Sequence, residues 1–356
     1  MELFVPGRIC LFGEHSDWAG GYRRVNPEIK RGYTLICGTE QGIYAEVAPH
    51  SNALVLTATT PKGETLGPRE IPLDPETLLD VARRGGFWSY VAGAAYQALT
   101  HYQVGGLVIR NFKTDLPIQK GLSSSAAICV LTARAFNLLY DLKLTTRGEM
   151  ELAYLGEITT PSRCGRMDQG CAFGSRPVLM TFDSDRLITA ELKAGQDLHF
   201  VIVDLQAHKD TLKILANLND CFPYASNKLQ QGVQDLLGPV NEEIVHQAVT
   251  ALQAGDAQQL GRLMTEAQAR FDQYAMPACP DELTAPVLHR VLEYEPLKPH
   301  IWGGKGIGSQ GDGSAQFIAR SEKDQQAVIE VVERELGMPC LKVTLRNGVR
   351  LSLIHI

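Results

Sequence analysis

The chain has 356 residues, and its 34 Lys and Arg against 40 Asp and Glu give a formal net charge of −6 at pH 7. Apolar residues make up 44% of the chain, which is ample for a core and argues against disorder. The mild acidity gives no footprint for nucleic acid, and the sequence has no run of about 18 apolar residues that would predict a membrane span. Because the first residues lack the pattern of a secretion signal, we expect a cytoplasmic protein with no nucleic-acid or membrane partner.

The first expected element is an apolar strand, Ile9 to Phe12, which leads into a polar, glycine-containing turn. Carboxylates such as Glu14 and Asp17 in this turn can each accept hydrogen bonds from several hydroxyls, as on a sugar, although a polar turn is more often simply solvated. A long basic stretch, residues 21–31, follows the turn. Residues 51–75 are rich in Thr, Pro and Gly, a composition that favours hairpins or surface loop.

Further along, apolar residues at helical spacing predict a helix over 87–99, and residues 106–112 predict a strand. The most informative segment comes next, where a glycine turn and three serines, Ser123 to Ser125, open an apolar helix that runs to about Tyr140. A helix start offers unpaired amides and the positive end of the dipole, so this segment predicts a phosphate site, and a serine hydroxyl there suits Mg²⁺. The alternative is an ordinary N-cap, for which one serine would suffice.

Two carboxylates then come close together in the sequence. Glu157 ends a predicted helix over 149–159, and Asp168 follows Pro161 and a glycine turn. Such a pair can divide the tasks of metal ligand and base, and a solvated loop is the simpler alternative. Strands are expected at 178–183 and 199–205, and the polar turn before the second strand marks the boundary between two lobes, residues 1–195 and 196–356.

The second half of the sequence is mostly helical in its apolar spacing. Helices are expected over 230–237, 242–254, 257–274, 282–293 and 325–335, and strands within 309–319 and over 340–345. The run from Gly306 to Gly311 matches G-x-G-x-x-G, but a probable strand follows it where a helix would be needed, so we do not expect an NAD site. Because strands and helices mix in both halves, the expected class is α+β.

Four segments occur in the order in which they are found in the GHMP kinases, the family of galactokinase, homoserine kinase, mevalonate kinase and phosphomevalonate kinase. Residues 121–126 resemble the phosphate-binding sequence G-L-S-S-S-A, and residues 6–17 resemble the galactokinase opening P-G-R-x-N-L-I-G-E-H-x-D. Residues 164–169 resemble C-G-x-M-D-Q, and residues 88–93 resemble W-x-x-Y-V-x-G. The resemblance implies an α+β, two-lobed GHMP kinase fold with the active site in the cleft between the lobes.

The resemblance also implies a role for each matched residue. The ATP phosphates would be bound by Lys120, Gly121, Leu122, Ser123, Ser124, Ser125 and Ala126. Ser125 and Glu157 would hold Mg²⁺, because family members place a Glu 11 residues before the catalytic Asp, as Glu157 stands to Asp168. Asp168 would orient or deprotonate the attacking hydroxyl, and Arg8 beside it would keep it ionised. The sugar would be contacted by Glu14, His15 and Asp17.

The implied activity is transfer of the γ-phosphoryl group of ATP, with Mg²⁺, to a hydroxyl of a small polyhydroxylated substrate. A galactose-like sugar phosphorylated at its anomeric hydroxyl is the first expectation, for a monomer or a homodimer. The alternatives are a non-sugar alcohol such as mevalonate, or a catalytically silent sensor of sugar and ATP. Two departures from the family pattern bear on the choice: the basic loop 21–31 is longer than in galactokinases, and Asp312 would repel ATP phosphates unless it faces away or helps to bind metal.

Overall fold

The computed structural model describes residues 1–116, 121–162 and 164–347, so Lys120 lies outside the described residues. Contacts divide the chain into two compact units, one formed by residues 1–8 and 38–175 and the other by residues 9–37 and the described residues from 176 onward. Both units combine helices with sheets, which confirms the α+β class. The units are discontinuous along the chain, unlike the expected lobes 1–195 and 196–356, which stay a prediction. In the described part, no helix has the length and apolar run that crossing a membrane requires.

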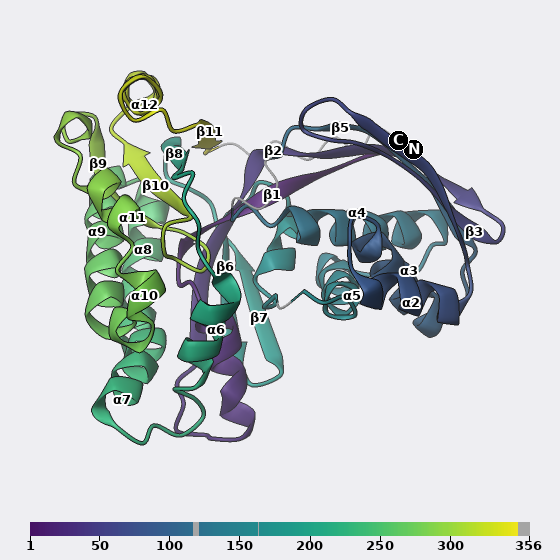
Figure 1. Cartoon of the computed structure of the whole chain (residues 1–356), viewed down its shortest axis with the longest axis horizontal. Helices are drawn as coiled ribbons and strands as arrows, with labels where there is room; N and C mark the ends of the chain where they lie inside the picture. The colour runs from purple at the N-terminus through teal and green to yellow at the C-terminus, as the bar shows by residue number, and fades with distance from the viewer. Residues whose placement is uncertain (117–120, 163, 348–356) are drawn as a thin grey trace. The chain divides into compact units, whose positions relative to one another are not determined.

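The first unit is a sheet with four helices lying along it (Figure 1). Its strands are β1 (Glu2–Phe12) and β2 (Gly32–His50), which both continue into the second unit, with β3 (Ala53–Thr59), β4 (Thr65–Pro72) and β5 (Gly106–Thr114). Its helices are α2 (Pro75–Arg84), α3 (Ser89–His101), α4 (Ser124–Leu139) and α5 (Thr146–Ile158), followed by a short 3₁₀ helix, Asp168–Phe173. The strand order is β4-β3-β5-β2, with β1 paired to β2, and β3 and β5 run parallel.

Helices α4 and α5 carry the segments that the sequence marks as functional. Ten of the 16 residues of α4 are buried, so the serine-started helix belongs to the core of its unit, as its apolar sequence predicts. Helix α5 begins where the Thr145 hydroxyl accepts a hydrogen bond from the Gly148 amide, earlier than the predicted start at 149. It ends at Ile158, and Pro161 prevents its continuation. This end places Glu157, which is buried, in the last turn of a partly buried helix.

Helices α3 and α5 approach each other closely at a point where each helix has a glycine, which has no side chain. A Cβ atom at Gly93 would lie 2.3 Å from the Gly156 carbonyl oxygen, and a Cβ atom at Gly156 would lie 2.6 Å from the Cα atom of Ala94. Both overlaps are with backbone, so no change of rotamer relieves them. This contact fixes α5, and with it the position of Glu157, against α3.

We expect the substitution Gly156→Ala to destabilise the protein by about 1–3 kcal/mol, because overpacking against backbone outweighs the better helix propensity of alanine. Urea unfolding measures the change. The matched control is Gly148→Ala in the same helix, where the new methyl group would meet only the side chain of Leu144, at 3.2 Å. If both variants unfolded at the same urea concentration as the wild type, the close helix contact would not be a constraint.

The second unit is built on a four-stranded antiparallel sheet of order β11-β8-β10-β9. These strands are β8 (Leu198–Asp204), β9 (Ile301–Gly306), β10 (Ser314–Ala319) and β11 (Cys340–Leu345), and the first half of β2 pairs separately with β6 (Val178–Asp183), which pairs with β7 (Arg186–Glu191). Its helices are α1 (Ser16–Ala19), α6 (Thr211–Asn219), α7 (Lys228–Asp235), α8 (Asn241–Ala254), α9 (Ala257–Tyr274), α10 (Pro280–Leu283), α11 (Pro286–Leu292) and α12 (Glu322–Val331). The wholly buried Gln325 of α12 donates hydrogen bonds to the carbonyls of Phe200 and Val343, so α12 is tied to β8 and β11.

The structure corrects the sequence prediction at several elements of this unit. The predicted helix 282–293 is two short helices, because Pro286 has no amide hydrogen for a continuous helix and instead starts α11. Helix α6 was not predicted, although Asp210 caps it by accepting a hydrogen bond from the Lys213 amide at 3.0 Å. Strand β9 also escaped prediction, because three of its six residues are glycine.

Candidate functional site

The segment predicted to bind phosphate forms a strained turn into helix α4. Gly121 and Ser123 both have left-handed backbone conformations, with φ of 74° and 56°, and for a serine this conformation is uncommon. The Leu122 carbonyl between them accepts a hydrogen bond from the Arg8 amide at 3.0 Å. Ser124 and Ser125 then begin the helix, and Ala126 is its first fully buried residue.

The Ser123 hydroxyl forms its hydrogen bonds with residues outside helix α4, which it precedes. It donates to Asp168 Oδ1 at 3.0 Å and accepts from the Arg8 guanidinium at 2.5 Å, and within the described residues its side chain makes no capping bond. A serine at a helix start normally caps it. The simple alternative of an N-cap therefore does not describe Ser123.

Arg8 and Asp168 form an ion pair, although 160 residues separate them in the sequence. The Arg8 side chain is buried, whereas the Asp168 side chain is 25% exposed, so the carboxylate is the member of the pair that a ligand can reach. The structure thus brings together both residues predicted to be catalytic, with Ser123 bonded to each. A buried guanidinium requires such a partner, because an unpaired charge in the interior is strongly destabilising.

Glu157 lies beside this pair and is almost wholly buried, at 1% exposure. Burial raises the pKa of its carboxyl to about 7, and the neighbouring Asp168 carboxylate adds to the rise. Hydrogen bonds from Ser125, Gln169 and Ser162 act in the opposite direction, and the last two measure 2.7 and 3.2 Å. Ser125 and Glu157, the predicted metal pair, are therefore in hydrogen-bond contact. Gln169 and Ser162 were not predicted, although Gln169 stands next to Asp168 in the motif.

The three residues predicted to contact the sugar belong to the second unit and are all buried. Glu14 lies in the turn after β1 and accepts a hydrogen bond from Lys305 of β9, whose side chain is 1% exposed. Asp17 stands in the first turn of α1 and is 8% exposed. Lys305 was missed by the sequence analysis, and the only signal for it was a lysine inside a glycine-rich run.

His15 is held in one protonation state by its surroundings. Trp18 Nε1 donates to His15 Nδ1 at 3.2 Å, so the neutral ring carries its proton on Nε2, and the ring stacks on Phe271. Burial lowers the pKa of His15 to about 4, and the charges of Lys209 and Lys305 contribute to the lowering. A hydrogen bond with the Ser309 backbone acts in the opposite direction and raises the pKa. The imidazole is therefore neutral at physiological pH.

Because the folded state disfavours protonation of His15, the free energy of unfolding should fall as the pH drops from 6.5 towards 4. Between pH 7 and about pH 4.5 the loss from this group amounts to about 2 kcal/mol. The variant His15→Asn has no titrating group, and asparagine tolerates the left-handed backbone found here (φ 69°). Urea unfolding at the two pH values should show the larger loss in the wild type, and an equal loss in both proteins would contradict the assignment.

The glycine-rich run that matched a dinucleotide motif is a tight connection between β9 and β10. Gln310 in this run is buried, has a left-handed backbone (φ 66°), and donates to the Gly306 carbonyl at 3.1 Å. The Asp312 carboxylate accepts a hydrogen bond from the Leu288 amide at 2.8 Å, in the first turn of α11. Asp312 thus caps α11 from outside the helix.

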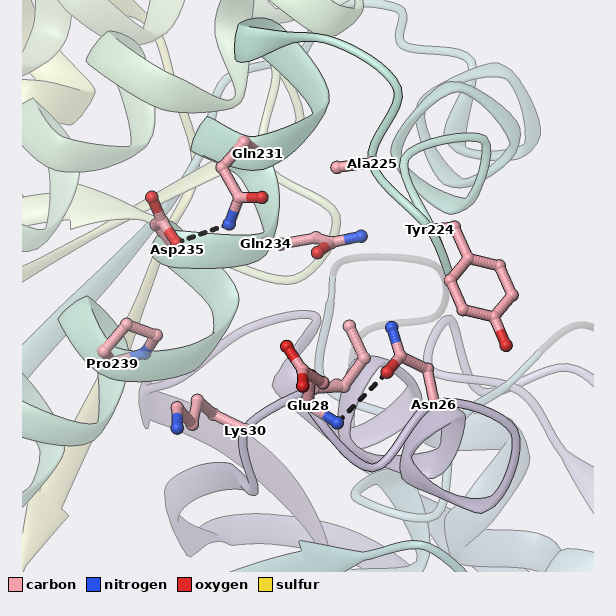
Figure 2. A pocket seen from close by; sticks show the side chains of 10 residues that line it. Asn26, Glu28, Lys30, Tyr224, Ala225, Gln231, Gln234, Asp235 and Pro239 are labelled. Atoms are coloured by element: carbon pink, nitrogen blue, oxygen red, sulfur yellow. Dashed lines mark hydrogen bonds between the residues drawn. The ribbon is translucent and has the colours of Figure 1, made fainter.

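The long basic loop 21–31 uses its positive charges internally. Arg23 and Arg31 bind the two carboxylate oxygens of Asp183, at 2.5 and 2.9 Å, and the hydrogen bond from Arg23 holds the pKa of Asp183 below its usual range. The far end of the loop, Asn26 to Lys30, borders a pocket of about 300 Å³ whose opposite wall includes Gln231 and Asp235 of α7 (Figure 2). The residues that line this pocket in the described part include none of the predicted site residues.

The chain was compared with known families and proteins. Residues 89–175 match the family described as GHMP kinases N terminal domain. The chain is 26% identical to a galactokinase of Thermococcus kodakarensis, over 94% of this chain and 93% of that protein. It is 24% identical to a galactokinase of Thermotoga maritima, over 95% of each.

Solved structures show the same fold at low sequence identity. The mevalonate kinase of Methanococcus jannaschii has a TM-score of 0.72 at 16% identity, covering 97% of this chain and 98% of that one. Lactococcus lactis galactokinase complexed with galactose has a TM-score of 0.71 at 18% identity, covering 99% and 95%. The α+β fold is therefore that of the GHMP kinases. The resemblance of this chain to that family, and within it to galactokinases, is confirmed, and these findings support a kinase of a sugar or another small molecule.

Proposed function

We propose that the protein transfers the γ-phosphoryl group of ATP to a hydroxyl of a sugar, with the anomeric hydroxyl of a galactose-like monosaccharide as the first acceptor. The observation that carries the proposal is the Arg8–Asp168 ion pair, set beside the serine-started helix α4 and next to the buried Glu157. Phosphoryl transfer requires alignment of the two reactants and stabilisation of spreading charge more than covalent help from the protein. This set of side chains suits that task.

Each predicted site residue of the first unit has a role in the proposed reaction. The residues from Gly121 to Ala126 hold the phosphates through backbone amides and serine hydroxyls at the positive end of α4, and Lys120, outside the described residues, is expected to join them. Asp168 accepts a hydrogen bond from the attacking hydroxyl and orients it, and takes its proton as the new bond forms. Arg8 keeps Asp168 ionised and places positive charge near the phosphoryl group in transit.

Ser125 and Glu157 fit a magnesium ion in chemistry and placement. Mg²⁺ prefers oxygen ligands and is usually bound through one or two carboxylates together with substrate phosphates. Glu157 is a buried carboxyl whose pKa burial raises to about 7, so a cation at this position would favour its charged form. When bound, the ion neutralises charge on the phosphate oxygens. In the part of the chain that the structure describes, no group of three or more His, Cys, Asp or Glu side chains is placed to hold a metal ion.

The acceptor is proposed to bind at Glu14, His15 and Asp17. These residues lie in the turn after β1 and in the first turn of α1, six to nine positions along the chain from Arg8. The neutral His15 can donate from Nε2, and the two carboxylates can accept from sugar hydroxyls. Relatives named galactokinase over nearly the full length of the chain support a sugar acceptor.

We expect Asp168→Asn to lower kcat by about 100- to 10,000-fold, because the variant has no group to accept the hydroxyl proton. The measurement is ADP release with ATP, Mg²⁺ and a panel of acceptors that contains galactose, other hexoses and mevalonate. The control is Asp80→Asn, which removes an exposed carboxylate paired with Arg84 in the same unit and should leave turnover unchanged. Full turnover in the Asp168 variant would refute the mechanism. If ADP formed with mevalonate and with none of the sugars, mevalonate would take the place of the sugar as the proposed acceptor. If ATP and sugar bound without formation of ADP, the protein would be a catalytically silent sensor.

A second prediction separates the proposed metal ligand from a structural carboxylate of the same helix. Glu157→Gln should raise the Mg²⁺ concentration needed for half-maximal rate by at least about 10-fold, while its stability at pH 8 stays equal or rises, because burial of the charged form is no longer required. Glu149→Gln is the matched control, since Glu149 is also buried but bonds to Arg134 and Asn137. That variant should lose stability and keep its Mg²⁺ requirement. Equal Mg²⁺ requirements in all three proteins would exclude Glu157 as a ligand.

A further inference from the structure

Lys209 is a partly buried lysine that the proposed mechanism does not use. It lies in the connection between β8 and α6, which is held on both sides. The Asp210 amide donates to Glu282 Oε2 at 2.8 Å, and the hydroxyls of Thr211 and Ser309 lie 3.1 Å apart. The Lys209 ammonium itself donates to the Gln310 carbonyl at 3.1 Å. The lysine is therefore fixed against the glycine-rich connection 307–313.

The glycines of that connection leave room for the lysine side chain. A Cβ atom at Gly313 would lie 2.5 Å from Lys209 Nζ and equally close to Cε, and a Cβ atom at Gly311 would lie 3.7 Å from Lys209 Cβ. Any side chain at 313 would thus push the ammonium group from its position. The sequence analysis left the purpose of this glycine-rich run open, and one consequence of its composition is to seat the lysine.

The Lys209 side chain is partly buried, and among the described residues no carboxylate forms an ion pair with it. Burial alone lowers its pKa to about 8, so the group still carries its charge at neutral pH. The acids close to it in the chain or in the glycine-rich run have other partners: Asp210 caps α6 and Asp312 caps α11. Lys213, one turn further along, shows the contrast, because it is more exposed and pairs with Asp281 at 2.9 Å.

The position of Lys209 relates it to the proposed acceptor residues. Lys209 binds the carbonyl of Gln310, and the residue before Gln310, Ser309, is hydrogen-bonded through its backbone to His15. The charges of Lys209 and Lys305 accordingly both lower the pKa of His15. The charge of Lys305 is balanced by its ion pair with Glu14, whereas that of Lys209 is not balanced in this way. A desolvated cation is costly unless an anion accompanies it. The site next to His15 is therefore suited to an anionic ligand.

We propose that Lys209 binds an anionic oxygen group, a carboxylate or a phosphate, on one of the ligands of the enzyme. The proposal rests on the proposed kinase function and deepens it, because two sources can supply such a group. The first is an acidic acceptor, such as a uronic acid or a sugar that already carries a phosphate. The second is the triphosphate of ATP. In either case the lysine discriminates ligands by charge, since a charged hydrogen bond favours the anionic group.

The experiment compares Lys209→Met with the wild type in equilibrium binding of four probes: galactose, galacturonate, Mg-ATP and inorganic phosphate. We expect the variant to bind at least one anionic probe about 10-fold or more weakly, and to bind galactose as the wild type does. Gly313→Ala should weaken the same probe, because the new methyl group displaces the ammonium, and Lys209→Arg should lose less than Lys209→Met. Lys213→Met is the control and should bind every probe normally.

The probes that lose affinity show which ligand supplies the anionic group. A loss for galacturonate with unchanged ATP affinity supports an acidic acceptor, a loss for ATP supports the triphosphate, and a loss for phosphate alone supports the anion site by itself. The proposal is overturned if Lys209→Met folds, as judged by its melting temperature, and binds all anionic probes as tightly as the wild type. Failure of the kinase proposal is separate, since it would show as absence of ADP formation by the wild type with every acceptor, whatever the binding results.

Discussion

The ion pair between Arg8 and Asp168 is the interaction on which the candidate site depends. It joins a residue of β1 to the start of the 3₁₀ helix after α5, and Ser123 is bonded to both members. Removal of one partner from a buried ion pair typically costs about 3–5 kcal/mol, because the other charge is left uncompensated. The pair therefore holds three distant segments of the chain together at one point. It also explains the left-handed backbone of Ser123, since the hydroxyl is directed to the pair and away from the helix.

Next to this pair, one carboxyl differs from Asp168 in its surroundings and so in its chemistry. Asp168 is partly exposed and paired with a guanidinium, whereas Glu157 is buried and surrounded by neutral hydrogen-bond donors. Burial moves the pKa of Glu157 upward to about 7. A carboxyl whose pKa is raised by burial beside a second acid is typical of functional sites. The close packing of α3 on α5 at Gly93 and Gly156 fixes the second of these acids.

The sequence predicted the class of fold and the grouping of the site better than it predicted the residues that support them. Elements with a regular period, such as the long helix α9 and the short strand β6, were predicted with their observed bounds. Helix α6, strand β9 and the break at Pro286 were missed, since capping, glycine content and one proline decide them locally. Lys305, which is buried, and Lys209, which is partly buried, were missed because the sequence does not show how far a lysine will be withdrawn from solvent. Their partners, Glu14 and the Gln310 carbonyl, are far away along the chain.

Strand β1 has a consequence for how this protein can vary in length. Side chains along a strand alternate between its two faces, so the face on which Arg8 lies is set by the parity of its position. Inserting or deleting a single residue within Glu2–Phe12 would shift one part of the strand by one position relative to β2, and if Arg8 lies in the shifted part it would move to the opposite face of the sheet. At the exposed tip of the β3–β4 hairpin, residues 60–64, a change of length does not alter the face on which Arg8 lies. Natural changes of length should therefore gather at that tip and be absent from the first strand.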